Sequence, residues 1–268
     1  MMFTTHADDG LIYLTADSLS RPGLAHAFTT RAGGVSRGIW SSLNLGVHRG
    51  DDYGSVLENY RIICSAIGVD EKRTVFSKQV HRDDVKIVAE SDAGYGLFRE
   101  TDYEADALVT DVPGMTLVVF SADCIPVLLF DPVRRCIGAA HAGWRGTALG
   151  TAVRAAEKMC SLYGSRPEDI IAAIGPGIGK CCYETDGDVP ETLINAHGAD
   201  AEPFIEKREG GKWHVDLKRV NAQILRSFGL TDISVCDRCT RCENDLFWSH
   251  RVAGTARGSQ AAMICLKP

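Results

Sequence analysis

Short hydrophobic runs separated by turn residues dominate the middle of the chain. Residues 116–120, 127–130 and 136–140 each have the length of a buried strand, and a proline-containing turn separates the first two runs. Continuous hydrophobic runs of this length are typical of strands that are buried on both faces. We therefore predict neighbouring strands here, with Cys124 in the first turn and His141 where the third strand ends.

Three other segments have the hydrophobic spacing of amphipathic helices, and each ends near a glycine: residues 54–68, 147–163 and 215–229. Further strands are predicted at residues 73–90, where a turn at residues 82–84 follows His81, and at 105–110, 169–174, 233–235 and 262–266. Residues 191–211 are polar, and a hairpin or loop is predicted at Gly210-Gly211.

This mixture of elements predicts one α+β domain of the α/β type, with mixed sheets, over residues 1–268. A doubly wound parallel sheet fits poorly, because short loops rather than helices connect many of the strands. No internal repeat or low-complexity linker divides the chain.

Composition narrows the functional classes. The net charge of −6 and the pI of about 5.8 argue against nucleic-acid binding. No apolar run is long enough to span a membrane, and the first ten residues do not resemble a signal peptide. The ten cysteines are therefore expected to be reduced thiols in a cytoplasmic protein, most of them inert packing residues.

A thiol and an imidazole at the ends of neighbouring strands suggest reactive chemistry. Cys124 and His141 can meet, and His81, at the end of a predicted strand, is a candidate third partner. Two imidazoles and a thiolate could bind a catalytic zinc ion with an open fourth position. The same residues could instead form a cysteine nucleophile with a histidine base, or be an ordinary buried cysteine with structural histidines.

Other polar residues are candidates for substrate contacts. Asp123, next to the cysteine, could orient a metal ligand or contact substrate. Arg31 precedes a glycine pair that could expose backbone N–H groups to an anion, although an ordinary surface turn fits this stretch as well. Asn44 lies in a polar loop that could serve either a site or a turn. The glycine-rich loop 175–179 matches neither standard nucleotide-binding motif.

Cys236, Cys239 and Cys242 form two consecutive Cys-x-x-Cys spacings, which raise the question of a second metal site. The usual second Cys-x-x-Cys pair of a zinc site is absent, and the fourth position of a ferredoxin-like run is Leu246. The spacing alone therefore does not establish a metal site at these three cysteines.

Several motifs along nearly the whole chain together resemble one known family. They are Thr30-Arg-Ala-Gly-Gly-Val-Ser36, Ser42-Leu-Asn-Leu-Gly46, Gln79-Val-His81, Ala122-Asp-Cys-Ile-Pro126, His141-Ala-Gly-Trp-Arg-Gly146, Gly175-Pro-Gly-Ile-Gly179 with Tyr183-Glu184, Cys239-Thr240 and Phe247-Trp-Ser-His-Arg251. The chain resembles the YfiH/laccase-domain family, formerly labelled multicopper polyphenol oxidases and now regarded as zinc-dependent purine nucleoside phosphorylases. Cys236 and Cys242 lie outside this signature, and His250 stands where an aromatic residue is expected.

The resemblance implies a layered α/β/β/α fold and assigns His81, Cys124 and His141 as metal ligands and catalytic residues, with zinc as the metal and copper as the alternative. It implies phosphorolysis of adenosine, inosine, guanosine or methylthioadenosine, and deamination of adenosine. Arg31, Asn44, Asp123 and Arg251 are the predicted substrate contacts, with Arg31 as the candidate for phosphate or ribose. We expect a monomer or small homo-oligomer that binds neither nucleic acid nor membrane.

Three alternatives remain at this point. A cysteine hydrolase or amidase would use Cys124 as its nucleophile. A copper-dependent polyphenol oxidase could use one cysteine and two histidines, but the clustered histidine pairs of a multicopper centre are missing. A zinc-dependent scaffold or binding protein would have a filled fourth coordination position.

Overall fold

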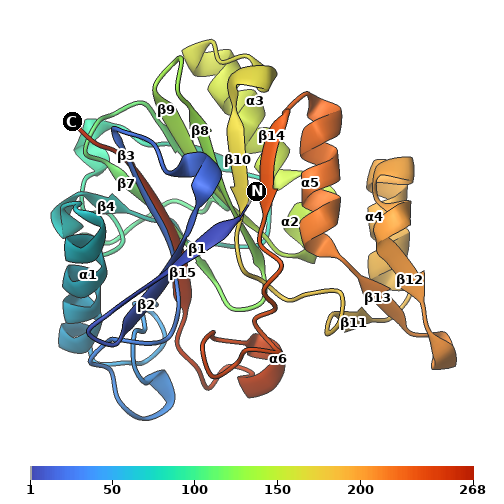
Figure 1. Ribbon diagram of the computed structural model, residues 1–268, viewed down its shortest axis with the longest axis horizontal. Coiled ribbons are helices and arrows are strands. Elements are labelled where there is room, and N and C mark those ends of the chain that lie inside the picture. The colour runs from blue at the N-terminus through green and yellow to red at the C-terminus, as the bar shows by residue number, and fades with distance from the viewer. Residues whose placement is uncertain (1) are drawn as a thin grey trace.

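A computed structural model describes residues 2–268 and contains two six-stranded sheets and one three-stranded sheet (Figure 1). The first sheet has the order β1 (Phe3–Asp8), β2 (Leu11–Ala16), β3 (Leu24–Thr29), β15 (Gln260–Leu266), β7 (Thr116–Ser121) and β4 (Thr74–Val75). The second sheet has the order β14 (Asp232–Val235), β10 (Ile171–Ile174), β8 (Ile125–Asp131), β9 (Cys136–Ala142), β6 (Ala107–Thr110) and β5 (Val85–Ile87). Both large sheets mix parallel and antiparallel pairs, as the sequence predicted.

The two large sheets face each other across a hydrophobic core. Alternate residues of each strand point to opposite faces, so Leu117 and Val119 of β7 join this core, while Val118 points to the other side. Strands β8 and β9 contribute Leu128 and Ala139 from the opposite sheet. Burial of the strands on both faces explains their continuous hydrophobic runs.

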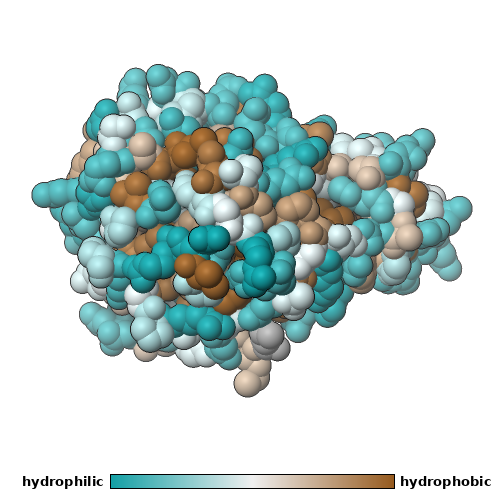
Figure 2. Space-filling view, turned by 90° about the horizontal axis from the view of Figure 1, so that it is seen from above, coloured by the Kyte–Doolittle hydropathy of each residue, from teal (hydrophilic) through white to brown (hydrophobic). Residues whose placement is uncertain are grey.

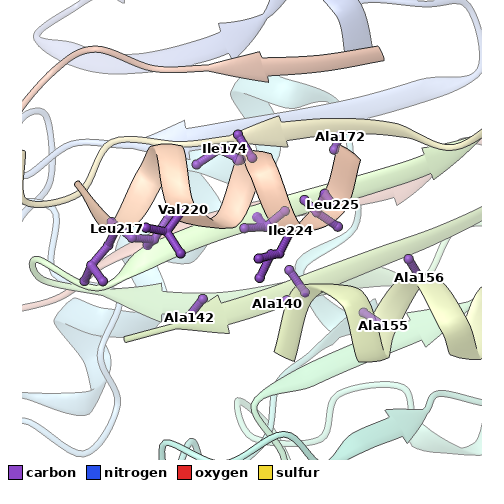
Figure 3. Packing of buried hydrophobic residues seen from close by; sticks show 14 of the residues in the cluster. Ala140, Ala142, Ala155, Ala156, Ala172, Ile174, Leu217, Val220, Ile224 and Leu225 are labelled. Atoms are coloured by element: carbon purple, nitrogen blue, oxygen red, sulfur yellow. The ribbon is translucent and has the colours of Figure 1, made fainter. Parts of the chain in front are cut away.

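Helices cover the outer faces of both sheets. Helix α1 (Tyr53–Ile67) packs on the first sheet, and helices α3 (Thr151–Tyr163) and α5 (Leu217–Phe228) pack on the second (Figure 3). Small residues of α3, such as Ala155 and Ala156, face Ala140 of β9 and allow close approach. The layers are therefore α/β/β/α, which confirms the predicted fold class.

The remaining elements are short. Helices α2 (Trp144–Leu149) and α6 (His250–Ala253) flank the site described below. The small sheet, ordered β11 (Glu184–Thr185), β13 (Trp213–Val215) and β12 (Ile205–Lys207), lies with α4 (Asp188–His197) to one side of the main body (Figure 1). The face shown in Figure 2 is mostly hydrophilic, with separate hydrophobic patches. Among residues 2–268 no helix has the length and apolar character needed to cross a membrane.

The structure corrects two predicted elements and adds a helix that was not predicted. The helix predicted at 147–163 is two helices, because Gly150 adopts a positive φ of 72° between α2 and α3. The predicted strand at 73–90 contains only β4 and β5, and the residues between them form a loop that carries His81. No helix was predicted in the polar stretch 191–211, which contains most of α4. In contrast, α1 and α5 end at Gly68 and Gly229 as predicted.

Candidate metal centre and active site

Cys124 lies in the turn where the chain passes from β7 of the first sheet to β8 of the second. The residue before it, Asp123, has a positive φ of 88°, an unusual conformation for a residue with a side chain. Gly143 lies so close that a Cβ atom there would be 3.0 Å from Cys124 Sγ and 3.1 Å from His81 Cδ2. Glycine at position 143 therefore leaves room for the sulfur and the ring to approach each other.

His141 and His81 are held in place by one buried carboxylate, that of Asp106. Its Oδ1 lies 2.8 Å from Nδ1 of His141 on β9. Its Oδ2 accepts the backbone N–H groups of Val80 and Arg82, at 3.0 and 2.9 Å, which flank His81. His81 itself has a positive φ of 61°, so its loop depends on these bonds. Because Nδ1 of His141 is occupied, its Nε2 remains for a ligand.

The ligand atoms of His81, Cys124 and His141 all lie within 4.8 Å of one another, and we call this group the His–Cys–His centre. Cys124 Sγ lies 4.0 Å from His81 Nε2, and the two imidazole rings meet edge to face at 4.9 Å. The predicted convergence of the three residues is thus present in the fold. One thiolate and two imidazoles are a donor set that suits a transition metal.

Electrostatics within the centre favour the thiolate. Enclosure alone would raise the pKa of Cys124, but the charge and hydrogen bond of His141, with a smaller contribution from His81, outweigh it and lower the pKa to about 6. Enclosure alone would lower the pKa of His141, whereas the charge of Cys124 and the hydrogen bond to Asp106 raise it. These shifts favour a thiolate–imidazolium pair in the metal-free centre, and a thiolate is the form of cysteine that binds a metal.

Two cavities meet at the His–Cys–His centre. The larger has a volume of about 730 Å³ and the smaller about 370 Å³, which is the size range of small-molecule sites. The two cavities share part of their walls, because both are lined by Arg49, His81, Ala122, Cys124 and Arg257. The centre is thus reachable from two sides by small molecules.

Arg49 and Arg257 form a cationic group at this junction. Arg257 is buried, its Nε has no hydrogen-bond partner, and its pKa is lowered to about 10 by burial and by the nearby charge of Arg49. Neither arginine forms a salt bridge with a carboxylate among residues 2–268. Two cationic groups without an anionic partner beside a reactive centre are suited to binding an anion.

Arg49 and Arg257 were not identified from the sequence. No local pattern distinguishes them from surface arginines, and they approach each other only through tertiary structure. Asp106 was also missed, although a charged residue at the start of the buried run 105–110 is an unusual feature that could have drawn attention to it.

The structure gives Arg31 and Asn44 other partners than substrate. The Arg31 guanidinium donates to the backbone oxygens of Ser41 and Asn244 and lies 4.0 Å from the centre of the Trp248 ring, outside both cavity walls. Asn44 is buried and joins two loops, because its Oδ1 accepts the N–H groups of Gly46 and Ser259. Asn44 also donates to the Asp51 carboxylate, so both side chains hold together the loops around the site.

Asp123 organises the wall of the larger cavity. Its buried carboxylate accepts hydrogen bonds from Thr240 Oγ1 at 2.6 Å, Ser249 Oγ at 3.1 Å and the Arg251 backbone N–H at 2.7 Å. Arg251 lines this cavity, and its side chain donates to the backbone oxygen of Glu184. Of the four predicted substrate contacts, Asp123 and Arg251 thus border the larger cavity, and Asp123 is already engaged by three donors.

The fold and the site define a class: α/β/β/α proteins with a candidate His–Cys–His metal centre between two cavities. Comparison with known proteins then identifies the family. The chain belongs to the family described as "Multi-copper polyphenol oxidoreductase laccase", whose model matches residues 25–267. This result confirms the resemblance inferred from the sequence motifs.

Individual relatives agree with this membership. The chain is 41% identical over 257 residues to a protein of Deinococcus radiodurans named purine nucleoside phosphorylase, covering 96% of this chain and 94% of that protein. It is 37% identical over 250 residues to purine nucleoside phosphorylase YlmD of Geobacillus stearothermophilus, covering 90% of each. The crystal structure of a Bacillus licheniformis hypothetical protein, YfiH, superimposes with a TM-score of 0.91 at 35% identity, covering 98% of this chain and 99% of that one.

Proposed function

We propose that this protein is a zinc-dependent purine nucleoside phosphorylase that also deaminates adenosine. The observation that carries the proposal is the His–Cys–His centre at the junction of two cavities, next to two arginines that form no salt bridge with any carboxylate of residues 2–268. The names of the relatives support the same activity. Adenosine, inosine, guanosine and methylthioadenosine are the proposed substrates, with phosphate as the second reactant.

The residues of the centre fit zinc. His81, Cys124 and His141 would hold the ion, and three protein ligands leave a fourth position for a reactant, as in catalytic zinc sites. Bound zinc would supply a Lewis acid that polarises an oxygen atom and makes water more acidic. The only other group of at least three such ligands among residues 2–268 contains no histidine, so the histidine-rich sites expected of a multicopper oxidase are not present in this part of the chain.

In the proposed phosphorolysis, Arg49 and Arg257 bind phosphate beside the centre, and Arg251 lies in the wall of the larger cavity, which has room for the nucleoside. A phosphate oxygen forms a bond to the anomeric carbon of ribose while the glycosidic bond breaks. The electron pair of the glycosidic bond passes to the purine, which takes up the proton that the hydrogen phosphate loses, and the products are the free base and ribose 1-phosphate. The arginines hold the anion and its attacking oxygen in position, which lowers the entropic cost of the reaction.

In the proposed deamination, a water molecule attacks the purine carbon that carries the amino group, and the amino group leaves as ammonia. Asp106 keeps His141 in one tautomer and orientation during both reactions. Both activities would use the same centre, so a change that removes Cys124 should abolish both.

A second candidate, a cysteine hydrolase, has one observation in its favour. Cys124, His141 and Asp106 form a nucleophile–base–carboxylate series with a thiol pKa below the ordinary value. Tight zinc binding at Cys124 would argue against it, because a coordinated thiolate is a weaker nucleophile.

The deciding experiment is chromatographic product analysis after incubation of zinc-loaded protein with adenosine, with and without phosphate. The variant Cys124→Ala removes a ligand, and Cys160→Ala, on the outer helix α3, is the matched control. We expect phosphate-dependent adenine and phosphate-independent inosine from the wild type and the control, and neither from Cys124→Ala. If the wild type forms no more product than Cys124→Ala, the nucleoside assignment is wrong.

A further inference from the structure

Four cysteines outside the His–Cys–His centre gather at one place on the structure. Cys181 and Cys182 follow the glycine-rich loop 175–179, and Cys239 and Cys242 lie in the loop after β14. Their four sulfur atoms all lie within 4.8 Å of one another, and we call them the tetrathiol cluster. Cys239 is buried, whereas Cys181 and Cys242 are exposed, so the cluster lies at the edge of the core.

The sulfur spacing fits one small ion. Zinc–sulfur bonds of about 2.3 Å in a tetrahedron place the sulfur atoms about 3.8 Å apart. Here Cys242 Sγ lies 3.6 Å from Cys181 Sγ and 3.4 Å from Cys182 Sγ. An iron–sulfur cluster would require wider spacing, because several irons and sulfides must lie between the thiolates. A single tetrahedral ion is therefore the occupant that this spacing allows.

The backbone around Cys239 is arranged for a thiolate ligand. The N–H group of Gly179 donates to Cys239 Sγ at 3.1 Å, and the N–H groups of Arg241 and Cys242 also point to this sulfur. Such N–H bonds stabilise negative charge on sulfur. A Cβ atom at Gly179 would lie only 3.1 Å from Cys239 Cβ on the other loop, so the close approach of the two loops requires glycine here.

We propose that the tetrathiol cluster binds a structural zinc ion. All four ligands are protein thiols, so this site is closed and offers no position for substrate. The ligand set corrects the set that the sequence suggested. Cys236 is buried in the core between the two large sheets and is not a member, while the adjacent pair Cys181-Cys182 supplies the ligands that the Cys-x-x-Cys spacing lacked.

The position of the cluster indicates what the second ion does. One of its loops leads directly into Tyr183 and Glu184 of the larger cavity. The other loop carries Thr240, whose hydroxyl binds the Asp123 carboxylate beside Cys124. A zinc ion bound to both loops would therefore fix one wall of the substrate cavity, and its loss should loosen that wall while leaving the ligands of the His–Cys–His centre in place.

The test uses the full-length Cys124→Ala protein, loaded with zinc and freed of excess metal, so that the first centre cannot contribute. We expect one zinc per chain by elemental analysis, and an X-ray absorption spectrum of four sulfur neighbours at about 2.3 Å. Adding Cys242→Ser or Cys181→Ser, both exposed positions, should remove this zinc, whereas adding Cys236→Ala should retain it. Circular dichroism would confirm that each variant is folded.

Several results would overturn the proposal: no zinc in folded Cys124→Ala protein, nitrogen or oxygen ligands in its spectrum, iron in place of zinc, or a disulfide among the four cysteines in the freshly purified protein. The inference does not rest on the proposed activity. Zinc counts in the Cys124→Ala background are independent of nucleoside turnover, so the two proposals can fail separately.

Discussion

Replacing Asp106 by Asn is expected to weaken zinc binding at the His–Cys–His centre by about 10- to 100-fold, the range found for partners of metal-ligating histidines. Asp106 is completely buried, and its two oxygens face three nitrogen atoms, those of the His141 ring and of the Val80 and Arg82 backbone. Asn has the same shape but only one oxygen. One of the two positions must therefore be occupied by an NH₂ group, which cannot accept a hydrogen bond.

Both orientations of the amide damage the centre. If NH₂ faces His141, Nδ1 must lose its proton and Nε2, the atom left for the metal, must carry one. If NH₂ faces Val80 and Arg82, the loop that holds His81 loses its acceptor. A hydrogen bond to a charged group contributes about 1.5–3 kcal/mol. A 100-fold loss of affinity is about 2.7 kcal/mol, so one such bond accounts for the expected range.

The assay is competition for zinc against a chromophoric chelator, and the matched control is Asp131→Asn. Asp131 is also a buried carboxylate that accepts two backbone N–H groups, but it lies at the other end of β8 from Cys124. We expect the control to bind zinc like the wild type. If Asp106→Asn also binds zinc as tightly as the wild type, the role assigned to Asp106 is wrong. If both variants lose zinc equally, the cause is general destabilisation.

Three further outcomes are expected. Arg257→Gln should raise the KM for phosphate by about tenfold or more, because a charged hydrogen-bond partner is lost. Arg31→Gln should leave the KM for phosphate unchanged. If steady-state kinetics show the same KM for both variants, the assignment of the anion site is wrong. In chelator-treated protein, Cys124 should react with iodoacetamide down to about pH 6 and become unreactive as the pH falls through that value. The reason is that its pKa in the folded protein is about 6, whereas an unperturbed thiol has a pKa of about 8.5. A reactivity midpoint near pH 8.5, measured by mass spectrometry, would refute the thiolate–imidazolium pair. Gly143→Ala should lower the zinc content of the His–Cys–His centre, since its new methyl group would lie 3.0 Å from the sulfur; unchanged zinc content by elemental analysis would show that the sulfur or the loop can move aside.

Sequence patterns predicted those features that depend on neighbours along the chain. Cys124 and His141 lie near the ends of β8 and β9, which pair directly, so their proximity follows from a hairpin. Helices α1 and α5 have clear hydrophobic faces and terminal glycines, and both were predicted. Local propensity and periodicity were sufficient in these cases.

Features that depend on distant segments were not predictable in the same way. Cys181 and Cys242 are 61 residues apart and meet only because their two loops are brought together in the fold. Arg49 and Arg257 lie near opposite ends of the sequence, and nothing in their local pattern marks them. Arg31, in contrast, belongs to a recognisable motif, yet its guanidinium binds backbone carbonyls. A motif indicates that a residue matters but does not show whether it contacts substrate or supports a loop.

The position of β15 has a consequence for protein synthesis. This strand is the last of the described strands in chain order, but it lies in the middle of the first sheet, hydrogen-bonded to β3 and β7 (Figure 1). While the ribosome is still translating residues before Gln260, β3 and β7 have no partner on that side, and their unpaired edges can join other chains. The nascent protein therefore cannot complete the sheet that leads to Cys124 until this segment has emerged, and translation that stops before it should yield an aggregating, inactive product.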